Sequence, residues 1–450
     1  MAKALVKYFG IALVLILVTF LICSEARSNK SGSSSSRTIR FPLYHREKFI
    51  ASNFKDQRSL VRTRLARDNA RFHRRHASSS AQFHKHSGND LNYTAVLEEG
   101  GEYVTVLKVG SPSQNVQLLV DIGTPLTWWQ CQPNCKYCYS TPHHIFDTST
   151  SSTYTETDCA EGFCDVTQLF ILGCIRRDDP KCHYRVQYVD GSVSQGVMAR
   201  DVVATSEGVT LHNSFSFGCG RSNQGVTMFN ADATGILGFV PGGYSFPSQL
   251  QANTFSFCLP TYNTTTSGSL YLNYYPSAFQ YSSRSMLIIR TGHYYLDFSG
   301  VEINQEAIPI PPENWQCDRE GVGGVIIDTG STITRFPKKA YDIFKDYFLR
   351  NAQGLPLSQP EEQLDTCFNV AGVGEWEGFV PKVRFLFKWP SGRPLEFETG
   401  QLLMSVGNNK YCLAFGAGGP TTIIGSWQLQ GSLVGFDLPN HLVGFLRASC

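Results

Sequence analysis

Two short segments of this 450-residue chain nearly repeat each other, at 118–124 and 325–331. Each is an apolar stretch that ends in an aspartate, Asp121 or Asp328, followed two residues later by a glycine and then by a hydroxyl residue. The two aspartates lie 328 − 121 = 207 residues apart, about the length of one domain. We therefore expect two similar halves, each presenting one carboxylate, at a site where two acids share a proton and activate a water molecule.

A second landmark follows each aspartate at a comparable spacing. The run Gly235–Gly238 ends 238 − 121 = 117 residues after Asp121, and the run Ile423–Gly425 ends 425 − 328 = 97 residues after Asp328. The order strand, Asp, Gly and then apolar, apolar, Gly therefore occurs twice, which indicates an internal duplication. One such Asp loop alone would be weak evidence, because Asp, Gly and a hydroxyl residue commonly form an ordinary turn.

Composition favours a β protein. Only 17% of the residues are charged, and the chain contains 40 Gly, 30 Phe and 20 Tyr. This pattern is typical of a turn-rich β chain rather than of a helical one. The length and the 42% hydrophobic content are ample for a buried core and more than one lobe.

The first 26 residues predict a secretory signal peptide. Lys3 and Lys7 precede an apolar run over 8–23, and small residues at 24 and 26 suit cleavage. The run is shorter than the ~20 residues that span a bilayer, so a membrane anchor, or a receptor-like cell-wall protein held by an uncleaved segment, is the weaker interpretation. We expect no stable membrane span, and a destination that is extracellular (cell wall or apoplast) or vacuolar.

Cysteine usage agrees with secretion. Of the 14 cysteines, Cys23 falls in the signal and an odd thirteen remain, so disulfides and at least one leftover thiol are expected. The tight cysteine group in Cys131–Cys138 could also bind zinc, but an oxidising compartment favours disulfides, and we predict no metal and no cofactor. Asn92 and Asn263 begin glycosylation sequons.

Charge separates an N-terminal arm from the rest. Residues 1–36 carry +3 and residues 37–86 carry +10, so residues 87–450 carry −11. A basic arm could bind nucleic acid or an anionic membrane, but a secreted chain rarely meets either, and no nucleic-acid partner is expected. We interpret 27–88 as a basic pro-segment that lies across an acidic cleft, with good helix formers at 56–75, and is released at falling pH. The alternative is a solvated arm without inhibitory function.

The chain resembles the pepsin-like aspartic proteases, in particular the cysteine-rich, nepenthesin-like plant subgroup. The resemblance covers nearly everything after residue 90. It rests on the two Asp loops and on further matches at Thr127–Cys138, Phe146–Asp147, Ser151–Tyr154, Phe217–Gly220, Phe255–Leu259, Asp365–Cys367 and Val443–Cys450. It implies an all-β, bilobal, monomeric protein with a deep cleft between two pseudo-two-fold-related lobes. The N-terminal lobe, 89–285, would carry a cysteine-rich insertion and a flap, and 286–450 would form the C-terminal lobe.

The same resemblance makes Asp121 and Asp328 a catalytic dyad. Two carboxylates a few ångströms apart cannot both ionise easily, so one keeps its proton and the pair titrates as a unit. The ionised acid takes a proton from a water molecule that attacks the scissile carbonyl, and the protonated acid hydrogen-bonds the carbonyl oxygen. No metal is needed for this chemistry.

Neighbouring residues would support the dyad. Gly123 and Gly330 permit the tight backbone that brings loop amides toward the carboxylates. Thr124 and Ser331 can donate hydroxyl hydrogen bonds that orient them.

The sequence departs from the family pattern at Ile122 and at Cys317. The family has Thr or Ser where this chain has Ile122, and the hydroxyls of the two loops grip each other's backbone there. Thr329 can form its hydrogen bond of this pair and Ile122 cannot. Loss of one such bond costs roughly 1 kcal/mol of stability, so we expect an enzyme with attenuated activity. Cys317 lies outside the usual cysteine positions and is the expected unpaired thiol.

A flap is expected over the cleft. The sequence Tyr-Val-Asp-Gly-Ser from residue 188 matches the hairpin of the subgroup, with Val189 where glycine is usual. The resemblance makes Tyr188 the flap tyrosine and Trp128 its hydrogen-bond partner, with Asp190 and Gly191 near the substrate. Such a lid excludes water. The alternative places Tyr188 in an ordinary strand and Trp128 in the core.

Two functions follow for comparison. The first is a secreted acid endopeptidase, made as a zymogen, that acts on protein or peptide substrates. The second is a catalytically weak or silent relative that acts by binding, such as an inhibitor of a secreted glycosidase. Retention of Asp121, Asp328 and Tyr188 favours the first, while Ile122 and Val189 leave room for the second.

Overall fold

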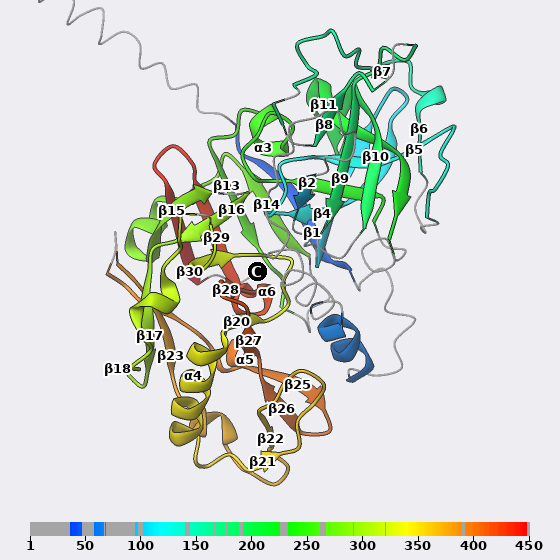
Figure 1. Ribbon diagram of the computed structural model, residues 1–450. Coiled ribbons are helices and arrows are strands. Elements are labelled where there is room, and N and C mark those ends of the chain that lie inside the picture. Colours follow the sequence, from blue (N-terminus) through cyan, green and yellow to red (C-terminus); the bar gives the residue numbers. More distant parts are fainter. Residues whose placement is uncertain are drawn as a thin grey trace, which may run out of the picture. The chain divides into compact units, whose positions relative to one another are not determined.

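The computed structural model describes most of the chain (Figure 1). The described residues are 37–46, 58–66, 68, 95–97, 102–139, 145–165, 167–168, 170–175, 178–188, 192–225, 233–261, 267–290, 292–319, 321–388 and 392–447. The chain divides into Met1–Arg37 and Thr38–Cys450, and every contact below lies within the second unit. The expected signal peptide lies outside the described residues. Among the helices that are described, none has the length and apolar character to cross a membrane.

Strands dominate the fold, which is all-β as predicted. The first half of the chain forms a mixed sheet from β2 (Ala95–Leu97), β3 (Tyr103–Val109), β4 (Gln114–Asp121), β5 (Trp128–Gln132), β7 (Thr155–Glu156), β8 (Ile171–Gly173), β9 (His183–Tyr188), β10 (Val193–Thr205), β11 (Thr210–Gln224) and β12 (Gly235–Gly238). Strand β6 (Phe146–Asp147) pairs with β5. Trp129 stacks on Phe217 inside this half, with ring centroids 3.8 Å apart.

An antiparallel sheet joins the two halves and the N-terminal segment (Figure 1). Its strands, in order, are β1 (Ile39–His45), β14 (Gly268–Leu272), β13 (Thr254–Cys258), β29 (Ser432–Asp437), β30 (Leu442–Arg447) and β15 (Ser283–Arg290). Phe255 of β13 stacks on Phe436 of β29 at 4.4 Å between centroids. The core of each half therefore continues through this sheet into the other.

The second half continues from this sheet. Its strands are β16 (His293–Leu296), β19 (Val325–Ile327), β28 (Thr422–Ile424), β20 (Thr334–Pro337) and β27 (Phe415–Gly418). Helix α4 (Lys338–Asn351) contacts β20 and β27 and buries Tyr341, Phe344 and Phe348, which lie on one face because they are three and four residues apart.

Smaller elements complete the second half and the connections. Two further sheets have four strands each. The first has the order β18 (Glu306–Ala307), β17 (Phe298–Ile303), β23 (Val383–Phe387) and β24 (Leu395–Glu396). The second has the order β21 (Leu357–Ser358), β22 (Cys367–Asn369), β26 (Lys410–Leu413) and β25 (Leu403–Gly407). The short helices are η3 (Thr148–Thr150), α3 (Phe246–Gln249), η4 (Ser277–Tyr281), η5 (Pro312–Trp315), η6 (Trp376–Phe379), α5 (Thr399–Leu402) and α6 (Ser426–Leu429).

The predicted duplication is confirmed by strand pairing. Strand β4 runs parallel to β12, with Asp121 opposite Gly238, and β19 runs parallel to β28, with Ile327 opposite Ile424. In both halves the strand after the Asp loop, β5 or β20, runs antiparallel to the same partner. The two apolar-Gly landmarks of the sequence are thus the strands that hold the two Asp strands in place.

Two glycines make this arrangement possible. A Cβ on Gly238 would lie 2.7 Å from the carbonyl oxygen of Leu126, and a Cβ on Gly425 would lie 2.5 Å from the carbonyl oxygen of Ile333. Both distances are too short for a real side chain, and the obstructing atoms belong to the backbone. Glycine is therefore required where the chain passes the residues that follow each aspartate.

Disulfides hold the first half together and also occur in the second. They link Cys131–Cys219, Cys135–Cys138, Cys159–Cys174, Cys164–Cys182 and Cys367–Cys412. Cys258 is also disulfide-bonded, and Cys317 is free, as the sequence predicted. The three cysteines considered as zinc ligands are thus all in disulfides.

We expect Gly238→Ala to destabilise the protein by about 1–3 kcal/mol, because the new methyl group meets backbone that cannot move aside cheaply. Gly243→Ala is the matched control, since Gly243 is exposed and nothing lies within 4 Å of the place that its new methyl group would take. Thermal unfolding of the two variants measures the difference. Equal melting temperatures would contradict the role given to Gly238.

Candidate active site

The two Asp loops have the same internal geometry. The Oδ1 atom of Asp121 accepts a hydrogen bond from the amide of Gly123 at 2.7 Å, and the Oδ1 atom of Asp328 accepts one from the amide of Gly330, also at 2.7 Å. Both acids are buried, with 1% of Asp121 and 6% of Asp328 exposed. Each carboxylate is therefore oriented by its own loop, as the glycine pattern predicted.

Hydrogen bonds from the loops to their partner strands fix the acids further. The amide of Asp328 donates to the carbonyl of Ile424 at 3.1 Å, and the carbonyl of Asp121 accepts from the amide of Phe239 at 2.9 Å. These bonds place each acid at the end of a parallel strand pair in the buried interior of its half. Backbone pairing, rather than side-chain packing alone, sets their positions.

The two hydroxyls of the loops behave differently. Ser331 donates from its Oγ to the Oδ2 of Asp328 at 2.8 Å, the orienting bond expected for it. The hydroxyl of Thr124 accepts a long bond of 3.4 Å from the amide of Leu126. The two loops therefore share the hydrogen bond from the glycine amide but differ in the hydrogen bonds of their hydroxyl groups.

Ile122 places an apolar side chain in the first Asp loop, between the aspartate and the glycine. Ile122 is 2% exposed and belongs to the main apolar core, so hydrocarbon occupies the place of the usual hydroxyl. Across the described residues the buried Oγ1 of Thr329 has no hydrogen-bond partner. The expectation that Thr329 still makes its half of the grip is therefore not met in this structure. An unsatisfied buried hydroxyl costs about 1–3 kcal/mol.

A hairpin carries the predicted flap tyrosine. Strands β9 and β10 are antiparallel, and the amide of Tyr188 donates to the carbonyl of Ser192 at 2.8 Å. The indole Nε1 of Trp128 donates to the Tyr188 hydroxyl at 2.6 Å, and both side chains are buried. The structure thus contains the pair that the sequence predicted.

Other predicted positions lie outside the described residues. They are the hairpin tip with Val189, Asp190 and Gly191, and the two glycosylation sequons at Asn92 and Asn263. Their roles stay predictions. No group of three or more metal-ligating side chains occurs within the described ranges.

The N-terminal segment, meaning the described residues between 37 and 68, packs against both halves of the protein. Its strand β1 pairs with β14 and β3. Its helical residues 58–66 bury Val61 and Leu65 against an apolar cluster of the second half. This cluster contains Ile333, Leu364, Cys367, Met404, Val406, Cys412, Ala414 and Trp427. The helix predicted at 56–75 is thus present in part, and it covers apolar surface beside the Asp328 loop.

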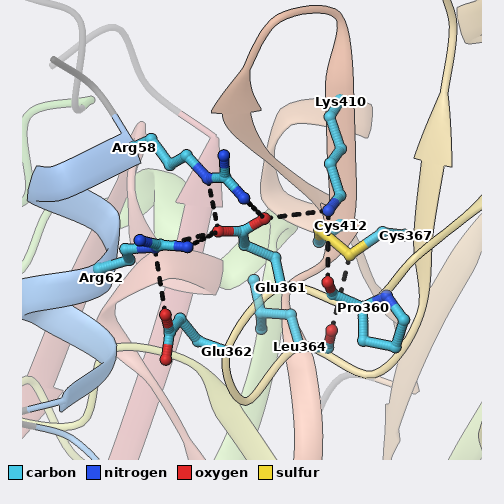
Figure 2. A network of polar contacts seen from close by, with 9 residues as sticks. All are labelled: Arg58, Arg62, Pro360, Glu361, Glu362, Leu364, Cys367, Lys410 and Cys412. Atoms are coloured by element: carbon cyan, nitrogen blue, oxygen red, sulfur yellow. Dashed lines mark hydrogen bonds and ion pairs between the residues drawn. A yellow bond between two sulfur atoms is a disulfide. The ribbon is translucent and has the colours of Figure 1, made fainter.

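A carboxylate of the second half collects the basic residues of this helix (Figure 2). Glu361, whose side chain is 2% exposed, accepts two 2.7 Å bonds from Arg58, bonds of 3.0 and 3.1 Å from Arg62 and a 2.9 Å bond from Lys410. Arg62 also lies 3.1 Å from the half-exposed Glu362. These hydrogen bonds, those of Arg58 above all, lower the pKa of Glu361 from 4.5 to about 2. Two arginines of the basic arm thus pair with an acidic residue of the second half, and the role of the arm as a pro-segment across the cleft stays a prediction.

A second ion pair has the opposite polarity. Asp68 of the N-terminal segment accepts from the guanidinium of Arg335 at 2.6 and 3.0 Å and from the amide of Thr332 at 2.9 Å. Both charged side chains are buried, with 5% of Arg335 and 2% of Asp68 exposed. In the sequence Asp68 is one of three acids within a basic arm, and no local pattern predicts that it pairs with Arg335.

Two family models cover most of the chain. The model described as "Xylanase inhibitor N-terminal" matches residues 103–272, and the model described as "Xylanase inhibitor C-terminal" matches residues 293–447. Each match contains one of the two Asp loops and its partner strand.

Curated relatives extend over nearly the whole chain. "Protein ASPARTIC PROTEASE IN GUARD CELL 2" of Arabidopsis thaliana is 32% identical over 433 residues, covering 92% of this chain and 87% of that protein. "Aspartic proteinase nepenthesin-2" of Nepenthes gracilis is 31% identical over 383 residues, covering 84% of each.

Solved structures share the fold at lower identity. The crystal structure of edgp has a TM-score of 0.64 at 19% identity, covering 78% of this chain and 94% of that one. Basic 7S globulin from soybean has a TM-score of 0.60 at 22% identity, with the same coverage. These likenesses concern the fold alone.

We expect Ile122→Thr to be more stable than Ile122→Val by about 1 kcal/mol, because only threonine offers a hydroxyl that can bond the backbone of the loop that carries Thr329. Threonine and valine have nearly the same shape, so denaturant unfolding of the two variants isolates the hydroxyl. Adding Thr329→Val to each should leave the difference in place, because the backbone partner of the new hydroxyl is unchanged. A valine variant that is as stable as the threonine variant would refute this account of the loop contact.

Proposed function

Because the chain belongs to the cysteine-rich, nepenthesin-like plant family of pepsin-like aspartic proteases, we propose that it is an endopeptidase synthesised as a zymogen. The observation that carries the proposal is the pair of equivalent Asp loops, each with its carboxylate 2.7 Å from a glycine amide. Two acids oriented alike, one from each half of a duplicated fold, suit a shared proton.

The proposed reaction is direct attack by water. The ionised member of the pair, Asp121 or Asp328, takes a proton from water as the oxygen attacks the carbonyl carbon of the scissile bond. The protonated member hydrogen-bonds the carbonyl oxygen, and the tetrahedral intermediate collapses as the amine leaves with a proton. The Ser331 hydroxyl, 2.8 Å from Asp328, would keep that carboxylate oriented through the cycle.

The flap pair would serve substrate binding. Trp128 holds the hydroxyl of Tyr188 at 2.6 Å, which positions the base of the hairpin. A peptide lying under the hairpin would be shielded from bulk water, which strengthens the electrostatic interactions of the dyad. Asp190 and Gly191, at the tip, would contact the substrate backbone.

We also infer that residues 27–88 act as the pro-segment and that the protein works as a monomer after secretion. The contacts of the N-terminal segment with Glu361 and Arg335 support this part of the proposal. The disulfides suit an oxidising compartment, which is extracellular or vacuolar.

One observation favours a second candidate function. Among the described residues the buried hydroxyl of Thr329 has no hydrogen-bond partner, and Ile122 offers no hydroxyl from the first loop. A protein with a weakened dyad could act by binding, for example as an inhibitor of a glycosidase. Tight binding to a partner protein without any peptide cleavage would favour that role.

We expect the acid-treated chain to cleave denatured globin at about pH 3–5, where one carboxyl of a dyad is protonated, and pepstatin to block cleavage. Asp121→Asn and Asp328→Asn should each lower the rate of cleavage by at least about a thousandfold, since both the attack of water and the departure of the amine need the two acids. Asp342→Asn is the matched control, because Asp342 is exposed and forms an ion pair with Lys338 on the surface of α4. Cleavage that survives both dyad substitutions would overturn the proposed mechanism.

Release of the N-terminal segment should depend on Glu361. The hydrogen bonds from Arg58, with smaller contributions from Lys410 and Arg62, lower the pKa of Glu361 from 4.5 to about 2, so its charge is present above about pH 4.5 and its attraction for the two arginines is lost as the pH falls toward 2. Glu361→Gln removes the charge at every pH and should shift release to higher pH. Trypsin susceptibility of the Arg-rich segment, measured across pH, gives the midpoint.

Glu362→Gln provides the comparison for this experiment. Glu362 is 44% exposed and makes one ion pair with Arg62, whereas Glu361 is nearly buried and collects three cations. A surface pair contributes little, so the midpoint of the Glu362 variant should stay near that of the wild type. Equal shifts in the two variants would contradict the role of Glu361.

A further inference from the structure

The second half of the protein contains a nearly enclosed site for one carboxylate. Three groups donate to Asp68: Nε and Nη2 of Arg335 reach its Oδ2, and the amide of Thr332 reaches its Oδ1. The side chains of both charged residues are at least nine-tenths buried. A guanidinium with an adjacent amide is a geometry that recognises a carboxylate through charge-assisted hydrogen bonds.

The donors belong to the proposed catalytic half and are held there independently of Asp68. Nη1 of Arg335 donates to the carbonyl of Ala417 at 3.2 Å, and its Nη2 also donates to Gln363 at 3.1 Å. The carbonyl of Thr332 accepts from the amide of Trp427 at 2.9 Å. Gln363 also donates to the carbonyl of Leu65 in the N-terminal segment at 2.7 Å, whereas Ala417 and Trp427 belong to the second half and would hold Arg335 and Thr332 when that segment leaves.

The duplication gives Arg335 a counterpart in the first half. Arg335 stands seven residues after Asp328, as Trp128 stands seven residues after Asp121. Both lie opposite the strand that holds the preceding Asp loop, at equivalent places in the two halves. Trp128 donates to Tyr188, in the hairpin proposed to cover the substrate, and Arg335 donates to the segment proposed to cover the site before activation.

Removal of the segment would leave a buried cation without its carboxylate, which is costly in a poorly hydrated place. We propose that Arg335 and the Thr332 amide then bind an acidic side chain of the peptide substrate, so that Asp68 occupies a substrate subsite in the precursor. The cluster that covers Val61 and Leu65 would accept apolar side chains beside it. This inference rests on the proposed function, because it names the substrate class of that same site.

Cleavage of matched peptides tests the subsite. Each pair of peptides differs only by Asp against Asn, or Glu against Gln, at one position between four residues before and four after the scissile bond. For one position we expect the activated protein to prefer the acidic peptide by about tenfold in kcat/KM at pH 5, the usual effect of a charged hydrogen-bond partner. The preference should shrink as the pH falls below about 4, where a free carboxylate takes up its proton.

Variants of Arg335 show whether this residue causes the preference for the acidic peptide. Arg335→Gln should remove the discrimination between the paired peptides, and Arg335→Lys should retain part of it, because it keeps the charge without the planar fork. Lys338→Gln is the control, since it removes a positive charge three residues away on the exposed surface of α4. Absence of any acidic preference in the wild type, or its persistence in Arg335→Gln, would overturn the inference.

A binding measurement separates this inference from the proposed catalysis. The full chain carrying Asp328→Asn is treated with trypsin to remove its Arg-rich segment and is titrated with a labelled peptide of residues 58–68. An Asp68→Asn version of the peptide should bind about tenfold more weakly at pH 6. Equal binding of the two peptides, or binding of neither, would refute the carboxylate subsite. A wild-type chain that cleaves no peptide but distinguishes these two would refute only the protease.

Discussion

The position of each candidate acid depends on a parallel strand pair. Strand β4 lies along β12 and strand β19 along β28, so that both acids stand at the end of a strand whose partner comes from about a hundred residues further on. The pairing is close because Gly238 and Gly425 have no side chain where the chain passes neighbouring backbone. Each loop can then turn its glycine amide back onto its own carboxylate at 2.7 Å. The orientation of the acids is therefore set by remote backbone contacts, and the loop sequence alone does not produce it.

The sequence predicts those features of the fold that depend on short motifs and on their order along the chain. The two Asp loops and the two later apolar-Gly runs are short, matched and equally ordered, so they predicted the duplicated strand pairs. The Trp128–Tyr188 contact and the free thiol of Cys317 were implied by the resemblance to the nepenthesin-like proteases. For the Asp loops and the apolar-Gly runs, a local pattern carries the information, and tertiary packing only has to agree with it.

The sequence did not predict contacts that depend on the register of one segment against another. Net charge predicted a basic arm on an acidic partner, which holds at Glu361, yet the buried Asp68–Arg335 pair reverses the polarity. A sum over thirteen cations and three acids cannot show which acid becomes buried. The unsatisfied hydroxyl of Thr329 is a similar case: the sequence shows that Ile122 lacks a hydroxyl, but it does not show that the Thr329 hydroxyl also has no partner among the described residues.

The opposite polarity of the two ion pairs matters for what remains when the N-terminal segment departs. On the Glu361 side the second half keeps a carboxylate, which still has Lys410 beside it at 2.9 Å. On the Asp68 side it keeps the guanidinium of Arg335, whose side chain is 5% exposed while Asp68 is bound. A buried cation without a counter-charge is costly. Under the proposal made above, departure of the segment therefore leaves a positive charge near the Asp328 loop, and a ligand with a carboxylate would satisfy it.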